Sequence, residues 1–303
     1  MDIPASDTPA MDQPAELGGF LRTRRARLRP EDVGLVSYGG RRRVPGLRRE
    51  ELAQLAGVSV AYYTRLEQGQ SHQASEGVLD ALARALRLSA DEQAYLRELA
   101  RPARVRRRPA VRHDKVRPGV RRLLAAVADV PAVALGPRFE ILAWNRLGHA
   151  LIAGHLDVDS PDRPLDRPNA QRMLFLDPHT RELYPDREEA LRHAVSSLRV
   201  AAGQRPDDPQ LTALIGELSM KSTEFSALWS RHGVGNCTFG TKRFHHPLVG
   251  ELVLDFEMMQ TPDGSGQGVL MYTAEEGSPS EAALRLLAAE CGPDVRVLEP
   301  ERP

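Results

Sequence analysis

The side chains of this sequence that are best suited to a chemical role are suited to binding, and they gather between residues 59 and 65. The candidates to contact DNA in this stretch are Ser59, Val60, Ala61, Tyr62, Thr64 and Arg65. An arginine guanidinium can donate two hydrogen bonds to a guanine edge, a contact worth about 1–3 kcal/mol of discrimination. Hydroxyl groups such as that of Ser59 can contact phosphate oxygens. The stretch is therefore a candidate for reading double-stranded DNA.

Two short helices and a tight turn must position these side chains. The first helix is expected near 49–56, because Glu50 and Glu51 suit the positive end of a helix dipole. Its apolar face at helical spacing consists of Leu52, Ala53 and Ala56. Gly57 follows where a helix end often needs a left-handed residue. Ser59 can cap the second helix, expected over 60–68.

The second helix should turn Tyr63 and Leu66 inward, because residues three apart lie on one face. The small side chains of Ala53 and Ala56 allow two helices to cross closely and steeply. An ordinary helical hairpin in a core is the alternative, but the whole register from Leu52 to Gly69 favours a helix-turn-helix, whose second helix enters the major groove.

Arginines gather just before the first of these helices. The connector over 29–48 contains several glycines and prolines, and it carries Arg41, Arg42 and Arg43 close to Arg49. A charge run is usually a solvated face. Because this run leads directly into the helix-turn-helix, we expect these arginines to contact phosphates, which would make DNA binding depend on salt.

The sequence contains no motif that clearly indicates a catalytic site. Residues 264–268, GSGQG, superficially resemble a phosphate-binding loop or a nucleophile elbow, but both motifs require a strand-to-helix junction, and this segment precedes an expected strand. His245 and His246 lack a third ligand at a useful spacing, so we expect no metal site and no cofactor. Cys237 is better suited to a buried inert thiol than to a redox switch. We therefore do not expect an enzyme.

Charge divides the chain more informatively than its net charge of zero suggests. Residues 1–117 carry 22 Lys and Arg against 15 Asp and Glu, whereas residues 118–303 carry 19 against 26. Only the basic half is expected to face a polyanion. The two cysteines are far apart, which argues against zinc fingers and a disulfide framework. Without an apolar span or a leader sequence, we expect a soluble cytoplasmic protein with no membrane partner.

The length of 303 residues suggests about two domains. Residues 1–15 lack periodicity and predict a disordered amino terminus. An all-α domain is expected over 16–101, and its five helices are expected at 16–28, 49–56, 60–68, 76–88 and 91–100. Residues 102–118 are rich in proline and arginine, which predicts a basic linker.

Residues 119–292 predict an α+β domain, and 293–303 predict a tail. Strands are expected at 130–136, 138–145, 236–246, 250–260 and 267–274. Helices are expected at 120–128, 146–154, 169–184, 187–203, 207–220, 222–232 and 278–290. The sequence PDGSG at 262–266 lies between the last two strands and is typical of a hairpin.

The amino-terminal register resembles the Cro-repressor-like, or XRE-type, helix-turn-helix family. Tyr63 is a departure, because that family usually has Ile or Val there. The wider stretch 39–69, GGRRRVPGLRREELAQLAGVSVAYYTRLEQG, resembles the MmyB-like regulators, in which paired tyrosines are usual. The resemblance implies an ion pair between Arg25 and Glu67 that joins the first helix to the recognition helix.

The second domain resembles the ligand-binding domain of the same MmyB-like group, which has a PAS-like fold. The matching stretches are AWNRLG (143–148), RMLFLDPHTRELY (172–184), LRVAAGQRPDDPQL (198–211), GELSMKSTEFSALWSRH (216–232), GTKRFHHPLVGELVLDFE (240–257) and YTAEEGS (272–278). The chain has Asp186-Arg187 where the group commonly has Asp-Trp. The resemblance implies a pocket between the sheet and its helices for a fatty-acid-like ligand.

Eight residues are candidates to line that pocket. The apolar candidates are Trp144, Phe175, Trp229, Phe239 and Met258. The polar candidates are Asn145, Arg172 and His246. The alternative for the apolar residues is an ordinary core position. The alternatives for the polar residues are a helix cap, a surface ion pair and a turn, respectively.

Together these features predict a one-component transcription regulator. We expect a homodimer that places two recognition helices about 34 Å apart on an inverted-repeat operator. Binding of a small apolar ligand would shift the two DNA-binding heads. In the alternative, the second domain only dimerises or recruits a protein partner and binds no ligand.

Overall fold

The computed structural model describes residues 13–35, 44, 46–70, 74–100, 115–233, 235 and 238–291. Contacts divide the chain into two compact units, and each is described by itself. Unit 1 combines Met1–Arg107 with Arg192–Asn236, and unit 2 combines Arg108–Leu191 with Cys237–Pro303. The chain leaves unit 1 after the amino-terminal helices and returns to it for three further helices.

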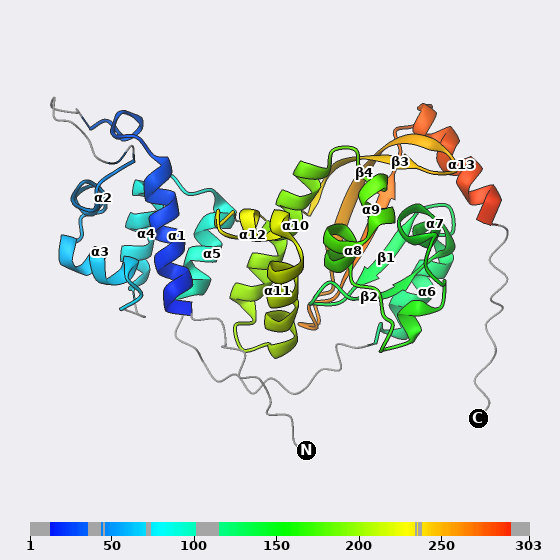
Figure 1. Ribbon diagram of the computed structural model, residues 1–303, viewed down its shortest axis with the longest axis horizontal. Coiled ribbons are helices and arrows are strands. Elements are labelled where there is room, and N and C mark those ends of the chain that lie inside the picture. The colour runs from blue at the N-terminus through cyan, green and yellow to red at the C-terminus, as the bar shows by residue number, and fades with distance from the viewer. Residues whose placement is uncertain are drawn as a thin grey trace, which may run out of the picture. The chain divides into compact units, whose positions relative to one another are not determined.

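Five helices build the amino-terminal part of unit 1, as the sequence predicts (Figure 1). They are α1 (Gln13–Arg27), α2 (Arg49–Ala56), α3 (Val60–Glu67), α4 (Glu76–Ala85) and α5 (Ala90–Ala100), with a 3₁₀ turn at Pro30–Val33 between α1 and α2. One apolar core joins them, and its central side chains are Phe20, Leu52, Tyr63, Leu66, Leu82 and Leu96. Burial of these side chains provides the main stabilisation of the bundle.

The turn between α2 and α3 has the predicted geometry. Gly57 ends α2 in the left-handed conformation, with φ of 65° and its amide donating to carbonyl groups of the last turn. Ser59 caps α3, because its hydroxyl oxygen accepts a hydrogen bond from the amide of Tyr62 at 3.1 Å. Ala53 and Ala56 are buried, so the two helices cross over small side chains.

A close backbone contact fixes where α1 crosses α3. A Cβ atom at Gly18 would lie 2.4 Å from the backbone oxygen of Glu67, a distance that no side chain tolerates. Glycine is therefore required at this position in α1. The sequence analysis did not single out Gly18, because its partner lies far along the chain.

Three more helices belong wholly or mostly to unit 1. They are α10 (Arg187–Gln204), α11 (Pro209–Lys221) and α12 (Thr223–Trp229). Asp208 caps α11 by accepting from the amides of Gln210 and Leu211, and Ser222 caps α12 by accepting from that of Phe225. Ser222 is the expected start of its helix, and Asp208 lies one residue after the start expected at 207.

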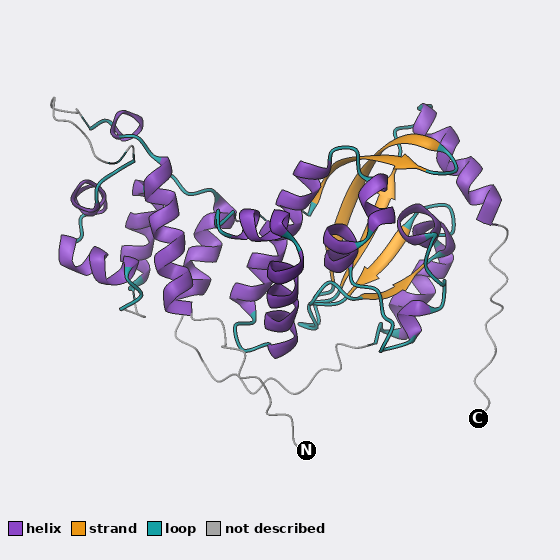
Figure 2. Ribbon diagram, in the orientation of Figure 1, coloured by secondary structure: helices purple, strands orange, loops and turns teal. Residues whose placement is uncertain are grey.

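Unit 2 is built on a five-stranded antiparallel sheet with the order β2-β1-β5-β4-β3 (Figure 2). The strands are β1 (Ala132–Leu135), β2 (Ile141–Trp144), β3 (Phe239–His246), β4 (Gly250–Gln260) and β5 (Gly268–Thr273). The hairpin between β4 and β5 is present as expected. The last strand of the sequence lies at the centre of the sheet, between β1 and β4.

Alternate side chains of a strand point to opposite faces of the sheet, and helices pack against these side chains. Ala132 and Ala134 of β1 pack with α6 (Pro118–Ala126), whereas Val133 and Leu135 of the same strand pack in a second cluster. Strand β1 is therefore buried on both faces. Strands β3 to β5 share a core with α7 (Arg146–Ala153), α9 (Pro178–Leu183) and α13 (Pro279–Cys291).

The helix expected at 169–184 is wrong as a single element. The structure has two helices, α8 (Ala170–Leu176) and α9, separated at Asp177. Pro178 has no amide hydrogen and disfavours a helical conformation at the residue before it, so the chain stops one helix and starts another. The other expected helices and strands are confirmed, with ends that differ by a few residues.

Some expectations concern residues outside the described part of the chain. These are residues 1–12 of the disordered segment expected over 1–15, most of the linker at 102–118, the tail at 293–303 and the state of Cys237. For residues 13–15 the expectation of disorder is wrong, because α1 begins at Gln13. No helix in the described part of the chain has the length and apolar character needed to cross a bilayer.

Two glycine substitutions should change stability in opposite directions. Gly57→Ala places a side chain at φ of 65° in open space, so it should cost about 1 kcal/mol through backbone strain alone. Gly77→Ala in the first turn of α4 also meets open space without a positive φ, so it should stabilise the bundle by about 0.5 kcal/mol. Urea unfolding followed by circular dichroism measures both. Equal effects of the two changes would contradict the assigned turn.

Candidate nucleic-acid interface

The side chains predicted to read DNA lie on the outer side of α3. Val60 is 41% exposed, and Ala61 and Arg65 are also exposed. Tyr62 and Thr64 are half-buried. Val60 and Thr64 are four residues apart, as are Ala61 and Arg65, so each pair lies along one side of the helix. This face therefore presents two small apolar groups, a hydroxyl and a guanidinium together.

The opposite side of α3 is fully anchored. Tyr63, Leu66 and Glu67 are each at most 1% exposed. Tyr63 and Leu66 belong to the apolar core of the bundle, as the sequence predicts. Because these three side chains hold this side of the helix, α3 cannot rotate about its axis without exposing core side chains.

Glu67 is the charged member of this anchor. Its carboxylate accepts two hydrogen bonds from Arg25, from Nε to Oε2 at 2.9 Å and from Nη2 to Oε1 at 2.8 Å. Arg49 adds a bond from Nη2 to Oε1 at 3.0 Å. The predicted pair of Arg25 and Glu67 is thus confirmed, and its two-pronged form gives it a defined geometry. The carboxylate joins α1, α2 and α3.

The electrostatics of Glu67 follow from this setting. Burial alone would raise the pKa of its carboxyl group, but the hydrogen bonds that the carboxylate accepts and the positive charge of Arg25 together outweigh burial and hold that pKa below its usual value. The carboxylate therefore stays charged when α3 is folded against α1.

The residues expected to contact phosphates lie around the ends of α2 and α3. Arg49 is bound to Glu67, yet its side chain remains 41% exposed. Ser59 uses its oxygen as the cap of α3 and keeps a hydroxyl hydrogen to donate. Arg41, Arg42 and Arg43 lie outside the described residues. Sequence reasoning missed Arg22, whose side chain is 61% exposed and lies 3.8 Å from the Glu67 carboxylate.

A second charged cluster joins α1 to the later helices of unit 1. Arg199 of α10 is completely buried, and its Nη1 donates to Oε2 of Glu16 at 2.8 Å. The same guanidinium lies 4.0 Å from the centre of the Trp229 ring. Arg24 of α1 is 4% exposed, and its Nη2 donates to the backbone oxygen of His232 at 2.9 Å. These contacts attach α1 to α10 and to the end of α12.

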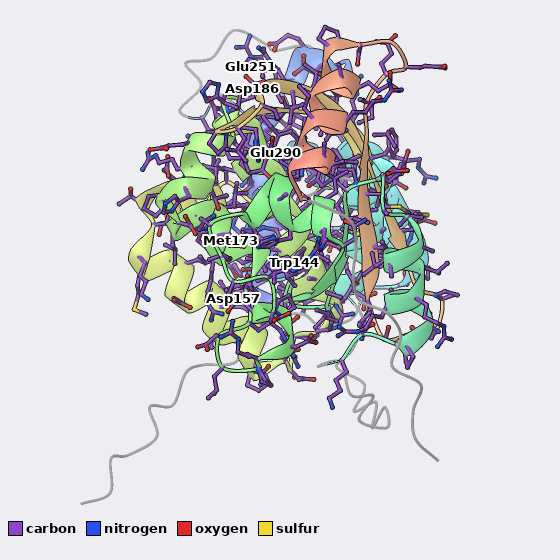
Figure 3. All side chains as sticks on the ribbon, turned by 90° about the vertical axis from the view of Figure 1, so that its right-hand side faces the viewer. Trp144, Asp157, Met173, Asp186, Glu251 and Glu290 are labelled. Carbon is purple, nitrogen blue, oxygen red and sulfur yellow. The ribbon has the colours of Figure 1, made fainter. Side chains whose placement is uncertain are left out.

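The eight residues predicted to line a ligand pocket do not all come together. Trp229 belongs to unit 1, where it stacks on Phe225, whereas the other seven belong to unit 2. Phe239 is 69% exposed at the start of β3. Trp144 and Met258 both border one apolar cluster that also contains Met173 of α8, and Figure 3 places Trp144 near Met173. Phe175 is buried two residues further along α8.

Two of the polar candidates have other bonding partners. The side-chain oxygen of Asn145 accepts from the amides of Ala132 and Gly148, and its nitrogen donates to two backbone oxygens. One ring nitrogen of His246 bonds the backbone oxygen of Ala150, and the other accepts from the amide of Leu248. Asn145 is thus a helix cap, and His246 is the last residue of β3, where its ring bonds the amide of the following turn. Arg172 is half-buried on α8.

Family comparisons match both parts of the chain. A helix-turn-helix domain family matches residues 16–96. The MmyB-like transcription regulator ligand binding domain matches residues 116–287, which is more than half of the 303 residues. Both are families of regulators rather than of enzymes. Among curated proteins, none matches this chain.

Replacement of the buried carboxylate should change both the stability of the bundle and its dependence on pH. Glu67→Gln leaves the guanidinium of Arg25 without its charged partner, so we expect a loss of about 3 kcal/mol at pH 7. The folded pKa of Glu67 is lowered, so its stabilisation is present above about pH 4.3 and is lost on acidification below that value. Urea unfolding at several pH values measures both effects.

The matched control is Glu50→Gln, which changes an exposed carboxylate in the first turn of α2. This variant should keep the stability and the acid sensitivity of the unmodified chain. A Glu67→Gln variant with unchanged stability, or with an undiminished loss of stability in acid, would show that the carboxylate does not anchor α3.

Proposed function

The chain belongs to the family of the MmyB-like transcription regulator ligand binding domain, and we propose that this DNA-binding regulator reads an inverted-repeat operator through α3 and responds to a small apolar, fatty-acid-like ligand. The observation that supports the first part is the outward face of α3. A capped helix presents Val60, Ala61, Tyr62 and Arg65 while its other side is locked into the bundle.

In this proposal, the side chains that contact base edges differ from those that contact the phosphates of the DNA backbone. Arg65 lies exposed in the last turn of α3, where its fork can reach the O6 and N7 atoms of a guanine. Val60, Ala61 and Tyr62 contact neighbouring base edges, with Thr64 beside them. Ser59, Arg49 and the arginines at 41–43 contact phosphates, which set the register on the duplex but carry no sequence information.

A homodimer gives this interface its specificity. One recognition helix covers only a few base pairs, whereas two related by a twofold axis read half-sites about 34 Å apart. Twofold symmetry of the protein then requires an inverted repeat in the operator.

The ligand part of the proposal rests on the apolar cluster beside Trp144 and Met258 in unit 2. Asn145 and His246 use their polar atoms on backbone groups, so the lining around them offers little polar recognition. Such a wall suits a hydrocarbon chain. Arg172 precedes Met173 of this cluster on α8 and is the residue whose positive charge would orient a carboxylate headgroup.

Helix α1 gives a physical route from the ligand-binding domain to DNA. The family domain at 116–287 includes α10 to α12, yet these helices share unit 1 with the DNA-binding bundle. Through Glu16 and Arg24, α1 is attached to α10 and to the end of α12. Through Gly18 and Arg25, the same helix is attached to α3. A shift of α10 would therefore move α1, and α1 would change the position of the recognition helix α3.

Arg65→Ala should weaken binding to the selected operator at least tenfold, because a two-pronged contact to guanine is worth about 1–3 kcal/mol. Binding to unrelated DNA should change much less. Selection of bound genomic fragments supplies the operator, and fluorescence anisotropy at fixed salt measures affinity. Arg84→Ala, which removes an exposed arginine from α4, is the control and should bind the operator normally. Equal affinities of Arg65→Ala and the control would refute the assigned base contact.

The purified chain should carry a small apolar molecule, visible in native mass spectrometry as an added mass that disappears on lipid extraction. The stripped and reloaded forms should differ in operator affinity by about 5- to 150-fold, the usual range of allosteric coupling. In Glu16→Gln the molecule should still bind, but this difference should shrink because the ion pair that joins α1 to α10 is lost.

The outcomes separate the parts of the proposal. If no molecule is carried and added fatty acids leave operator affinity unchanged, the second domain only dimerises or recruits a partner, and the ligand proposal is wrong. If a ligand effect persists undiminished in Glu16→Gln, the ligand proposal stands and the route through α1 is wrong.

A further inference from the structure

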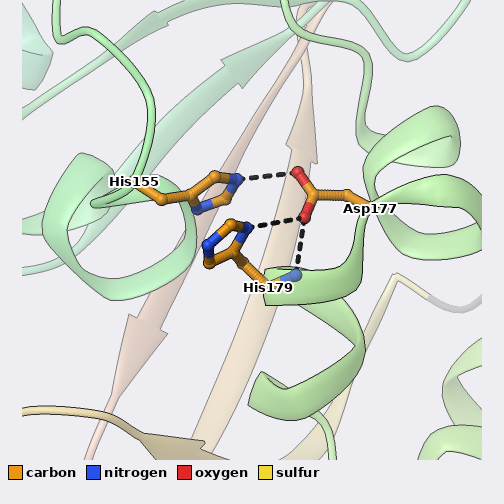
Figure 4. Close-up of side chains that lie close together, drawn as sticks. All are labelled: His155, Asp177 and His179. Atoms are coloured by element: carbon orange, nitrogen blue, oxygen red, sulfur yellow. Dashed lines mark hydrogen bonds and ion pairs between the residues drawn. The ribbon is translucent and has the colours of Figure 1, made fainter.

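Three potential metal-binding side chains meet in unit 2, next to segments that contribute to the apolar cluster proposed to bind a ligand. His155 follows α7, whereas Asp177 and His179 lie at the junction of α8 and α9. One ligand atom from each of the three residues lies within 4.8 Å of the other two. The close-up in Figure 4 shows both imidazole rings facing the same carboxylate.

The possible ligand atoms of these three residues lie at distances close to those between the ligands of a metal ion. Nε2 of His155 lies 2.7 Å from Oδ2 of Asp177, and Nδ1 of His179 lies 3.5 Å from Oδ1. The two rings stack with their centres 4.5 Å apart and their planes 14° apart. Ligands of a tetrahedral zinc ion, each at about 2.0–2.2 Å from the metal, are roughly 3.3 Å from one another. Small rotations of the exposed ring would close the site.

The carboxylate is held in place by the start of α9. Oδ1 of Asp177 accepts hydrogen bonds from the backbone amides of His179 at 2.7 Å and of Thr180 at 3.3 Å. These bonds fix the orientation of the carboxylate and leave Oδ2 directed at His155. Backbone donors of this kind orient the carboxylate ligands of established metal sites. The break at Pro178, which separates α8 from α9, is what creates this geometry.

The three side chains differ in their exposure to solvent, and this difference makes the site partly ordered yet accessible. The side chains of His155 and Asp177 are 21% and 20% exposed, respectively, although His155 as a whole residue is exposed, and the hydrogen bond between the two side chains orders them. The side chain of His179 is 69% exposed and leaves the site open to solvent. Two ligands are thus positioned in advance, and the third can close over an arriving ion.

The donor set indicates the kind of metal. Two imidazole nitrogens and one carboxylate oxygen suit zinc and its first-row neighbours, whereas calcium and magnesium prefer oxygen ligands alone. We propose that His155, Asp177 and His179 form a zinc-binding site, with water in the remaining coordination position. Bound zinc would fasten the segment after α7 to the corner between α8 and α9.

Sequence spacing does not indicate this site. The sequence alone predicts no metal site, because the adjacent pair His245 and His246 lacks a third ligand. His155 lies 22 residues before Asp177 in the chain, so only the fold brings the three donors together.

The test uses the full chain, stripped of metal with a chelator and titrated with zinc chloride in a calorimeter. We expect one equivalent of zinc to bind with a dissociation constant of about 10 μM or tighter, and saturating zinc to raise the unfolding temperature by mass action. His179→Ala should weaken binding at least tenfold. Because the His179 side chain is mostly exposed, this variant should keep the fold, which circular dichroism checks.

The matched control is His245→Ala. His245 also pairs with a carboxylate, Glu251, at 2.8 Å on an exposed surface, but no third donor joins this pair among the described residues. The control should bind zinc as the unmodified chain does. X-ray absorption of the zinc-loaded chain should show nitrogen and oxygen ligands with two imidazoles.

The proposal is overturned by any of three results. These are no binding at 1 mM zinc, unchanged affinity in His179→Ala, or sulfur in the first coordination shell of the metal. The last result would assign the zinc to Cys237 or Cys291.

Discussion

The carboxylate of Glu67 is a buried charge at the point where α1, α2 and α3 meet, and its need for cationic partners determines how these helices pack. An unpaired carboxylate in this position would cost several kcal/mol. Arg25 satisfies both carboxylate oxygens at once, and Arg49 adds a third contact from α2. The absence of a side chain at Gly18 lets α1 approach the backbone at the end of α3. The outward direction of Arg65 is a consequence of these constraints.

The two sides of the short helix α3 have different roles. Residues at one set of helical positions fix α3 in the bundle, and residues at the other set are left to contact an external partner. Rigid presentation matters because base contacts lose energy when the side chains that make them must first be ordered. The same helix α1 that fixes α3 also binds Arg199 of α10, so the state of the later helices can bias the interface.

Local signals in the sequence predicted local structure well. The left-handed Gly57 and the cap at Ser59 each depend on neighbouring residues, and both are confirmed. The helices that begin after Asp208 and Ser222 start within two residues of the expected positions. The break at Pro178 was also a local signal, and the sequence analysis overlooked it. The pair of Arg25 and Glu67 was expected only through family resemblance.

Long-range placement could not be predicted. Nothing near β5 indicates that the last strand lies between β1 and β4, and nothing near Arg199 indicates that Glu16 is its partner. Side chains with two plausible roles were also ambiguous: Asn145 and His246 are polar residues near an expected pocket, yet both bond backbone groups. The contacts proposed with DNA and with a ligand remain predictions, because they depend on partners outside this chain.

The most direct test of the central claim is an amide chemical-shift map of the isotopically labelled protein titrated with its selected operator. The account predicts that the largest changes fall on the outward face of α3, at Val60, Ala61, Tyr62, Thr64 and Arg65, while the amides around Glu67 and Arg25 keep their shifts because the anchor stays intact. Largest changes elsewhere in the bundle, with residues 59–65 unaffected, would contradict it.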